Sequence, residues 1–459
     1  MNANTAHGDF ARGVTLMHEG DAAGAMAAFE AALGADPTLL EAHVNLGLLW
    51  AERDFARSQQ HYLSAIGLDP HRIDAYLHLG ALLASRKHFA EAEQRYHQAL
   101  AIDPDSAPAL SNMGVLFASS GRPEQALACY RAAIAIAPDY QRARFNLSYL
   151  LLRQGDLAAG WRAFESRSWY AGMAAYFHFP RWDGEALAGK SLLISVEAGH
   201  GDMIQFCRYA TLAKARGAAR VGLVCHDGLK RLFGSLAGVD ALYALGEAVP
   251  REGWDYWTPP LSMPYHCATT LATIPAHLPY LAPSMADCAR LAPLLAAGPQ
   301  LRVGLVWQGN PQFDNDGDRS IASLATLAPL ATVADVRFFS LQKGAGAAQA
   351  AAADWLDDLA PAIDDFADTA ALIAGLDLVI AVDTAVAHLA GALGKPCWLL
   401  LPAYQTDWRW LTGRDDTPWY PGVMRLFRQP QSGQWDSVVE AVRQALVQRV
   451  ALSIAVKGQ

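Results

Sequence analysis

Three polar segments of this chain each follow a short apolar run, where side chains at a strand end could do chemistry. The first, residues 197–206, holds Gly199 and Gly201 before Asp202 and Gln205. The two glycines allow a tight turn and a close approach of the backbone. Asp202 would stand at a helix start, where its carboxylate could act as a general base toward a hydroxyl group or simply cap the helix.

The second segment, residues 307–320, is a polar loop that contains Arg319, whose planar guanidinium suits a pair of diphosphate oxygens. Its acidic run begins like a calcium-binding loop, but Ala325 occupies the twelfth position and cannot ligate, so calcium is not expected. The carboxylates could hold another metal, but a solvated acidic loop is the favoured interpretation and no metal site is predicted. A neighbouring predicted strand ends in a second polar pair. The candidate donor-binding residues of these loops are Gln308, Asn310, Arg319, Gln342 and Lys343.

The third segment is the most specific, because an apolar strand, residues 378–382, runs directly into Asp383 and Thr384. The following residues predict a helix, and the unpaired N–H groups and dipole at a helix N-terminus favour phosphate. His388 lies four residues after Thr384, so both share one helix face. A capped helix with a packed histidine is the alternative interpretation.

Short β-rich runs alternate with helical stretches from residue 190 onward, which predicts parallel sheets with crossover helices. A break rich in Ala and Pro, residues 281–300, separates two Rossmann-like lobes, residues 190–285 and 300–459. Ligands of such sheets bind at the carboxyl ends of the strands. The clearest predicted strands are residues 192–196, 221–224, 303–307, 336–341, 378–382 and 397–401.

The first third of the chain repeats itself. Pro37, Pro70, Pro104 and Pro138 are separated by 33, 34 and 34 residues, the period of a helix–turn–helix solenoid. Small residues such as Gly80 and Gly114 recur where two helices must approach closely. This pattern resembles the tetratricopeptide repeat and predicts an all-α solenoid over residues 1–167. An aromatic-rich junction, residues 168–189, is expected to dock rather than to remain a loose tether.

One slot of the repeats holds Asn45, His78, Asn112 and Asn146. A carboxamide can donate to and accept from a peptide group, so a stacked row of them could hold an extended polypeptide. The row is similar to the asparagine ladder of repeat-bearing O-linked N-acetylglucosamine transferases. The alternative is that asparagine is simply a common, half-exposed residue at this slot.

The composition narrows the class of protein. The net charge is −9 and basic residues do not cluster, which disfavours a nucleic-acid groove. The six scattered cysteines suit reduced thiols, no apolar run approaches a membrane span, and the N-terminus does not resemble a signal peptide. We therefore expect a cytoplasmic protein.

Residues 190 to about 430 resemble glycosyltransferase family nine, the heptosyltransferases, of the GT-B fold. Gly201-Asp202 matches the family's Gly-Asp after the first strand, Arg319 its donor-lobe basic residue, and Asp383, Thr384 and His388 its Asp-Thr-x-x-x-His signature. The resemblance implies that Asp202 is the base of an inverting transfer and that Asp383 orients the donor sugar. It also implies that Arg319, Thr384 and His388 hold the donor diphosphate.

The resemblance implies a metal-independent inverting glycosyltransferase that needs no cofactor beyond its nucleotide-diphosphate sugar. Its acceptor, a protein or a glycan, would be recruited by the repeats. The chain departs from plain heptosyltransferases by its repeats and by Gln308 and Asn310, where they often carry Ser or Thr, so heptose is not specified as donor. The alternative is a non-catalytic repeat scaffold with a degenerate transferase-like domain.

Overall fold

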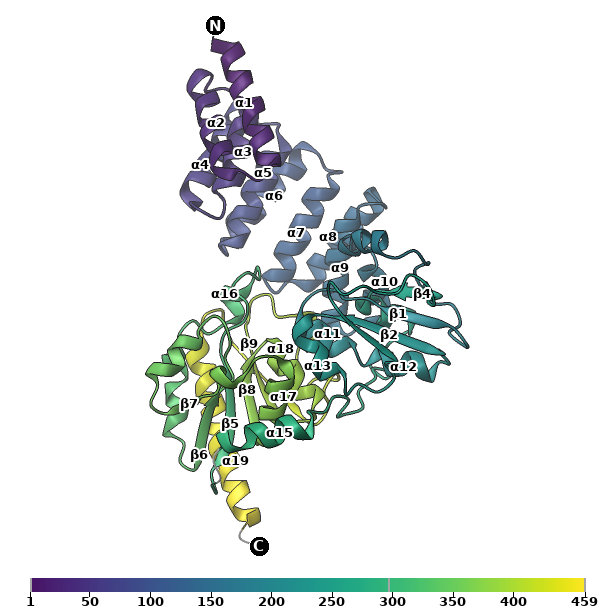
Figure 1. Cartoon of the computed structure of the whole chain (residues 1–459). Coiled ribbons are helices and arrows are strands. Elements are labelled where there is room, and N and C mark those ends of the chain that lie inside the picture. Colours follow the sequence, from purple (N-terminus) through teal and green to yellow (C-terminus); the bar gives the residue numbers. More distant parts are fainter. Residues whose placement is uncertain (1, 296–297, 458–459) are drawn as a thin grey trace. The chain divides into compact units, whose positions relative to one another are not determined.

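The computed structural model describes residues 2–295 and 298–457. The chain divides into two compact units, Met1–Leu150 and Leu151–Gln459. Figure 1 labels the helices and strands of both. No helix among the described residues is long and apolar enough to cross a bilayer.

Unit 1 consists of helix pairs, and α9 continues across its boundary with unit 2. The helices are α1 (Asn2–His18), α2 (Ala22–Ala35), α3 (Leu40–Trp50), α4 (Phe55–Leu68), α5 (Ile73–Ser85), α6 (Phe89–Ile102), α7 (Ala107–Ser119), α8 (Pro123–Ile136) and α9 (Gln141–Gln154). Helices α2 and α4 begin with aspartate caps, in which Asp21 and Asp54 accept from the backbone N–H three residues on. The predicted helical solenoid is confirmed.

The same contact recurs inside successive helix pairs, where a glycine of the first helix faces an aromatic ring of the second. A Cβ added at Gly80 would lie 2.4 Å from Tyr96, and one at Gly114 would lie 2.5 Å from Tyr130. These distances are too short for any side chain, so only glycine allows this helix spacing. The earlier pairs are Gly13 with Phe29 and Gly47 with Tyr62.

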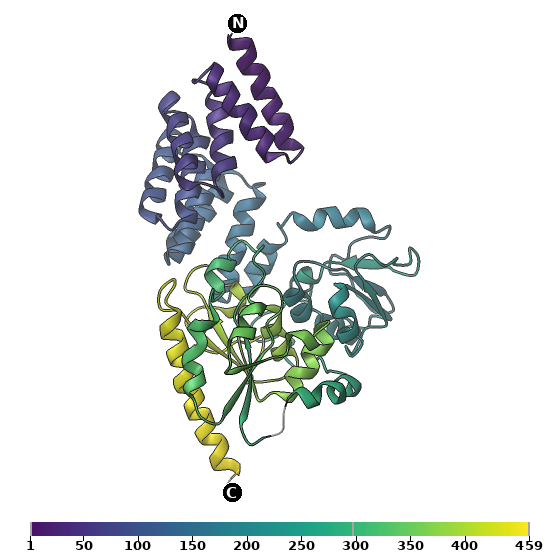
Figure 2. The same cartoon turned by 60° about the vertical axis from the view of Figure 1, so that its left-hand side comes forward.

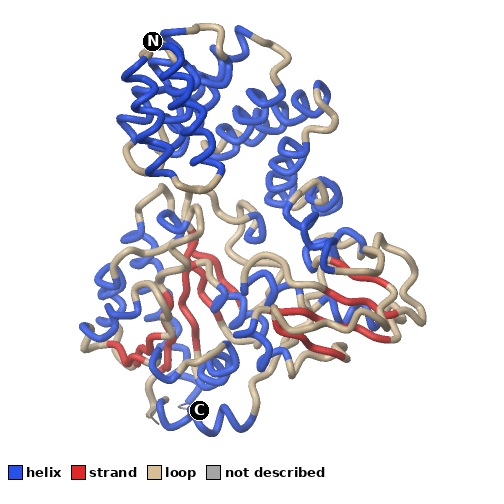
Figure 3. Tube along the Cα trace, turned by 45° about the horizontal axis from the view of Figure 1, so that its top comes forward, coloured by secondary structure: helices blue, strands red, loops and turns tan. Residues whose placement is uncertain are grey.

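Unit 2 contains two parallel sheets, visible as two groups of red strands in Figure 3. The first lobe has the strand order β3-β2-β1-β4. Its strands are β1 (Ser191–Ile194), β2 (Arg220–Cys225), β3 (Ala241–Ala244) and β4 (Tyr256–Thr258). Its helices are α11 (His200–Phe206), α12 (Tyr209–Ala215), α13 (Asp227–Phe233) and α14 (Met263–His266), with η2 (Pro260–Ser262) before α14. Helix α15 (Met285–Leu291) and η3 (Ala292–Leu294) lead to the second lobe.

The second lobe has the order β10-β9-β8-β5-β6-β7. Its strands are β5 (Leu301–Val306), β6 (Val336–Ser340), β7 (Leu356–Asp358), β8 (Leu378–Val382), β9 (Cys397–Leu401) and β10 (Met424–Arg428). Its helices are α16 (Asp316–Arg319), η4 (Leu324–Thr332), η5 (Ala347–Ala352), η6 (Ala360–Ala362), α17 (Phe366–Gly375), α18 (Ala385–Ala392), η7 (Trp408–Trp410) and α19 (Trp435–Lys457). Figure 2 shows α19 in yellow, running beside this lobe to the C-terminus. Strand β8 is buried along its whole length, which explains why it reads as a continuous apolar run.

The compact repeat unit ends at Leu150, and the helix that follows α9 belongs to unit 2. Trp161 of α10 (Leu157–Phe164) makes edge contacts with Phe206 and Trp408. The side chain of Arg167 donates to Glu197 at 2.7 Å, and both residues are buried.

The aromatic junction is docked only in part. Phe177 stacks on Trp257 with ring centroids 4.7 Å apart, and Trp182 is buried. Tyr176, at the end of η1 (Trp169–Tyr176), is 81% exposed, so including it among the docked aromatics was wrong. The side chains of Trp169 and Tyr170, also expected to dock, lie outside the described residues.

Candidate functional site

Asp202 stands in the first turn of α11, the helix that follows β1 along the chain. Its Oδ2 accepts from the backbone N–H of Gly199 at 2.9 Å. One carboxylate oxygen therefore caps the helix start, as the alternative interpretation expected. Its Oδ1 accepts from the guanidinium of Arg409, so the carboxylate also takes part in an ion pair. The left-handed backbone of the turn falls at Ala198, with φ of 59°, whereas Gly199 has φ of −91°. The expected tight turn is thus made by Ala198 rather than by a glycine.

Asp383 and Thr384 lie where the buried strand β8 meets α18. The indole N–H of Trp410 donates to Asp383 Oδ2 at 2.7 Å. Burial, and then the negative charge of Asp407, raise the pKa of Asp383 to about 6. Thr384 precedes α18 without capping it, and its hydroxyl oxygen is buried without a hydrogen-bond partner. A buried hydroxyl and open N–H groups beside a carboxylate form a place for an anionic or polar ligand.

Segment 407–411 ties these two carboxylates together, because Arg409 contacts Asp202 while its neighbour Trp410 contacts Asp383. Arg409 also donates to both oxygens of Asp407, at 3.0 Å each, and to Gln205 Oε1 at 2.5 Å. The structure thereby brings Asp202, Gln205 and Asp383 together from the two lobes. Arg409 is not among the residues predicted from the sequence, where its local signal is the Trp408-Arg409-Trp410 run.

His388 is a packed residue of α18. Its Nδ1 lies 2.8 Å from the hydroxyl of Tyr420, and its ring stacks on Trp410 with centroids 5.2 Å apart. A Cβ added at Gly201 would lie 2.9 Å from the His388 ring, so this glycine allows the two lobes to touch. Burial, and then the charges of Arg409 and Arg208, hold the pKa of His388 well below its usual range. The ring is therefore neutral at neutral pH, and its contact with a diphosphate stays a prediction.

Arg319 is the last residue of α16, in the segment that follows β5. Its Nε donates to Asp316 at 3.0 Å, and its guanidinium lies 4.4 Å from the Phe313 ring centroid. Its positive charge is one of those that lower the pKa of Asp383, against the larger effect of burial. Arg319 therefore acts electrostatically on the donor-side carboxylate Asp383, and its partner Asp316 neutralises part of its charge.

The other side chains predicted to bind the sugar donor form hydrogen bonds with backbone groups of this lobe. The Gln342 amide accepts from the N–H groups of Trp307 and Gln308 and donates to three backbone carbonyls, so it braces the two loops. Gln308 donates to Ala322 O at 2.7 Å, and Asn310 accepts from the Gln312 N–H at 3.1 Å. The exposed Lys343 donates to Ala360 O at 3.0 Å.

Ion pairs also hold the two lobes against each other. Asp368 of α17 is buried and accepts from both Arg231 of α13 and Arg290 of α15. His200 stacks between His226 and Phe366, with centroids 4.3 and 5.2 Å away. These contacts hold α11 against the second lobe and so fix the separation of Asp202 and Asp383.

The predicted ladder in unit 1 lies on the first helices of four successive pairs, α3, α5, α7 and α9. All four side chains are half-buried: Asn45, His78, Asn112 and Asn146. His78 stacks on Tyr62, and Asn146 donates to Ser111 at 3.3 Å. The row therefore combines three carboxamides with one imidazole ring, and its binding of a peptide stays a prediction.

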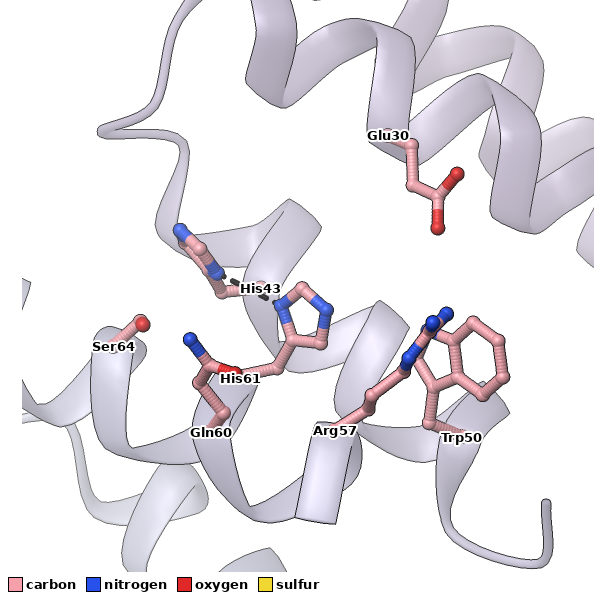
Figure 4. A pocket seen from close by; sticks show the side chains of 7 residues that line it. All are labelled: Glu30, His43, Trp50, Arg57, Gln60, His61 and Ser64. Atoms are coloured by element: carbon pink, nitrogen blue, oxygen red, sulfur yellow. Dashed lines mark hydrogen bonds between the residues drawn. The ribbon is translucent and has the colours of Figure 1, made fainter. Parts of the chain in front are cut away.

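Unit 1 also has a cavity of about 270 Å³ that none of the ladder residues lines. Figure 4 shows His43 and His61 pointing toward each other, with Nδ1 atoms 3.1 Å apart, so one ring donates and the other accepts. Burial lowers the pKa of both rings. The Arg57 guanidinium lies 4.6 Å from the Trp50 ring centroid. The cavity is lined by Glu30, His43, Trp50, Arg57, Gln60, His61 and Ser64.

Comparison with known sequences bears on both units. Sequence models of the tetratricopeptide repeat match residues 71–139 and 112–167. The model described as glycosyltransferase family 9 (heptosyltransferase) matches residues 334–400, which run from β6 through β9. The chain joins tetratricopeptide repeats to a glycosyltransferase family 9 domain. The matched part of the family 9 domain includes Asp383, Thr384 and His388, but neither Asp202 nor Arg319.

A curated relative is similar in sequence to part of this chain. Protein FlbA of Caulobacter vibrioides is 30% identical over 325 residues, which cover 65% of this chain and 53% of FlbA. The chain thus matches only about half the length of this relative.

Two solved structures are similar over roughly a third of the chain. MamA is 22% identical, with a TM-score of 0.30 over 36% of this chain and 97% of MamA. A tetratricopeptide repeat protein from Parabacteroides merdae is 18% identical, with a TM-score of 0.32 over 38% of this chain and 68% of that protein.

Proposed function

We propose that the family 9 domain of this chain transfers a sugar from a nucleotide-diphosphate donor to an acceptor hydroxyl, with inversion at the anomeric carbon. The observation that carries the proposal is that two adjacent residues bond to carboxylates of different lobes, Arg409 to Asp202 of the first lobe and Trp410 to Asp383 of the second. A base on one lobe and a phosphate-binding helix start on the other are what a two-substrate transfer requires.

In the proposed reaction the acceptor hydroxyl gives its proton to Asp202 as its oxygen forms a bond to the anomeric carbon. The bond from that carbon to the diphosphate oxygen breaks, and the electron pair leaves with the nucleotide diphosphate. Arg319, the Thr384 hydroxyl and the open N–H groups of α18 would stabilise the charge that develops there. Asp383 would orient the sugar through its hydroxyl groups. These protein donors make a metal ion unnecessary in the proposal.

The repeats would supply the acceptor, since tetratricopeptide repeats are typical protein-binding modules. The half-buried row of Asn45, His78, Asn112 and Asn146 is the candidate for holding an extended polypeptide. A protein, or a glycan carried by one, is the acceptor class that this arrangement favours.

One observation favours a second function, a scaffold with a non-catalytic domain. Arg409 and Trp410 already satisfy Asp202 and Asp383, as polar groups in a structural core would be satisfied. A scaffold would leave nucleotides unbound.

Thermal unfolding of the full chain with UDP, ADP and GDP sugars, each at saturating concentration, separates the two functions. A donor at about 100 times its dissociation constant stabilises its binding unit by about 2.7 kcal/mol. A clear rise in melting temperature with the sugar donor of one nucleotide, together with release of the matching nucleotide diphosphate over hours, supports the transferase. No shift with any of the three favours the scaffold.

A further inference from the structure

Both oxygens of the Asp202 carboxylate are occupied. Oδ1 accepts from Arg409, and Oδ2 accepts from the Gly199 N–H at 2.9 Å. A general base must present an oxygen to the proton that it removes. In this arrangement the oxygen on the open side of the carboxylate is covered by a guanidinium.

Arg409 is shared between two carboxylates. It donates to both oxygens of Asp407 at 3.0 Å as well as to Asp202, and its Nε donates to Gln205. The Arg409 side chain is only 8% exposed, whereas Asp202 and Asp407 are 23% and 27% exposed. The cation therefore lies inside and its two acidic partners line the open side.

The same guanidinium is close to the place proposed for the donor phosphates. Its neighbour Trp410 is bonded to Asp383, and Asp383 directly precedes the unpartnered hydroxyl of Thr384 at the start of α18. The charge of Arg409 also acts on Asp383, where it lowers the pKa against the effect of burial. A diphosphate at α18 would thus reach Arg409, and guanidinium pairs with phosphate in a two-pronged geometry.

We propose that Arg409 is a positioning residue that exchanges partners. Without a donor it covers Asp202; when the nucleotide diphosphate enters, its N–H groups turn to the phosphate oxygens and leave Asp202 open to the acceptor hydroxyl. This inference rests on the proposed function. It prevents the base from acting while the donor site is empty.

Calorimetric titration of the full chain with UDP, ADP and GDP in turn tests the exchange. Asp202→Asn keeps an oxygen for the Gly199 N–H but removes the charge that competes for Arg409. The nucleotide diphosphate should therefore bind Asp202→Asn about tenfold more tightly than the wild type, because a charged hydrogen bond no longer has to be broken. Arg409→Gln should bind it at least tenfold more weakly. In the double variant, the gain from Asp202→Asn should vanish.

Two further variants complete the test. Asp227→Asn removes an exposed charge from α13 of the same lobe and should leave the affinity within about twofold. Arg409→Lys replaces Arg409→Gln if the Gln variant does not fold. It keeps the positive charge but loses the two-pronged guanidinium geometry, so its affinity should lie between those of the wild type and Arg409→Gln.

The outcomes separate this inference from the proposed function. Equal or weaker nucleotide binding by Asp202→Asn would overturn the partner exchange while leaving the transferase intact. Binding by neither the wild type nor Asp202→Asn would overturn the proposed function itself. Binding by Asp202→Asn alone would support the exchange, because it would show that Asp202 holds Arg409 away from the ligand.

Discussion

The indole N–H of Trp410 donates to the carboxylate of Asp383 at 2.7 Å. Because Arg409 beside it contacts Asp202, one short segment fixes a carboxylate from each lobe. The next residue, Leu411, has φ of 52° and ψ of −174°, a conformation that costs a residue with a side chain about 1–3 kcal/mol. The fold bears that strain at the point where Arg409 and Trp410 must point to different lobes.

Replacing Asp383 by Asn should stabilise unit 2 in a pH-dependent way. Burial raises the pKa of Asp383 from 3.8 to about 6, so the folded wild type loses stability as the pH rises from 3.8 through 6. Asn does not ionise and still accepts from Trp410. Melting curves should show a higher melting temperature for Asp383→Asn than for the wild type at pH 8, and a much smaller difference at pH 4. Equal differences at both pH values would contradict the assignment.

Removing Arg167 should destabilise unit 2 strongly. Its side chain is fully buried against Glu197, and Arg167→Ala would leave that carboxylate buried without its cation. Breaking a buried ion pair by removing one partner costs about 3–5 kcal/mol.

Tryptophan fluorescence during urea unfolding can measure this loss, since Trp50 is the one tryptophan outside unit 2. Arg443→Ala, which breaks an exposed pair with Glu440 on α19, is the control and should change little. Similar midpoints for the two variants would show that the Arg167 pair is dispensable.

A methyl group at Gly80 should destabilise the repeats. The added Cβ would lie 2.4 Å from Tyr96 in the facing helix, and overpacking of this kind costs about 1–3 kcal/mol. Gly67→Ala is the matched control, because Gly67 lies in α4 with nothing within 4 Å and Ala favours helix by about 1 kcal/mol. Helical circular dichroism on heating should move in opposite directions for the two variants; a neutral Gly80→Ala would disprove the close approach.

Gly201→Ala should loosen the contact between the lobes. Its Cβ would lie 2.9 Å from the ring of His388, which Trp410 and Tyr420 hold in place. We expect unit 2 to melt about 2–4 °C lower. Gly199→Ala in the same turn meets only Asp202 at 3.4 Å and should melt like the wild type. If both variants melt alike, Gly201 is not the point of contact.

The strand-end residues could be predicted from sequence because a buried strand and the polar residue after it are adjacent in the chain. Asp383 after β8 is an example. The partner of Asp202 could not be predicted, since Arg409 is more than two hundred residues away and only the docking of the lobes brings them together. The edge strands β3, β4, β7 and β10 were missed because most are three or four residues long and show no clear alternation.

Turnover by Asp202→Asn tests the proposed transfer most directly. The measurement is the rate at which nucleotide diphosphate is released from the donor sugar that stabilises the full chain, with Asp227→Asn as the control for a lost charge in the same lobe. Asp202→Asn should still bind the donor but release product at least a hundredfold more slowly, because no carboxylate removes the acceptor proton. Release at the wild-type rate would contradict Asp202 as the base.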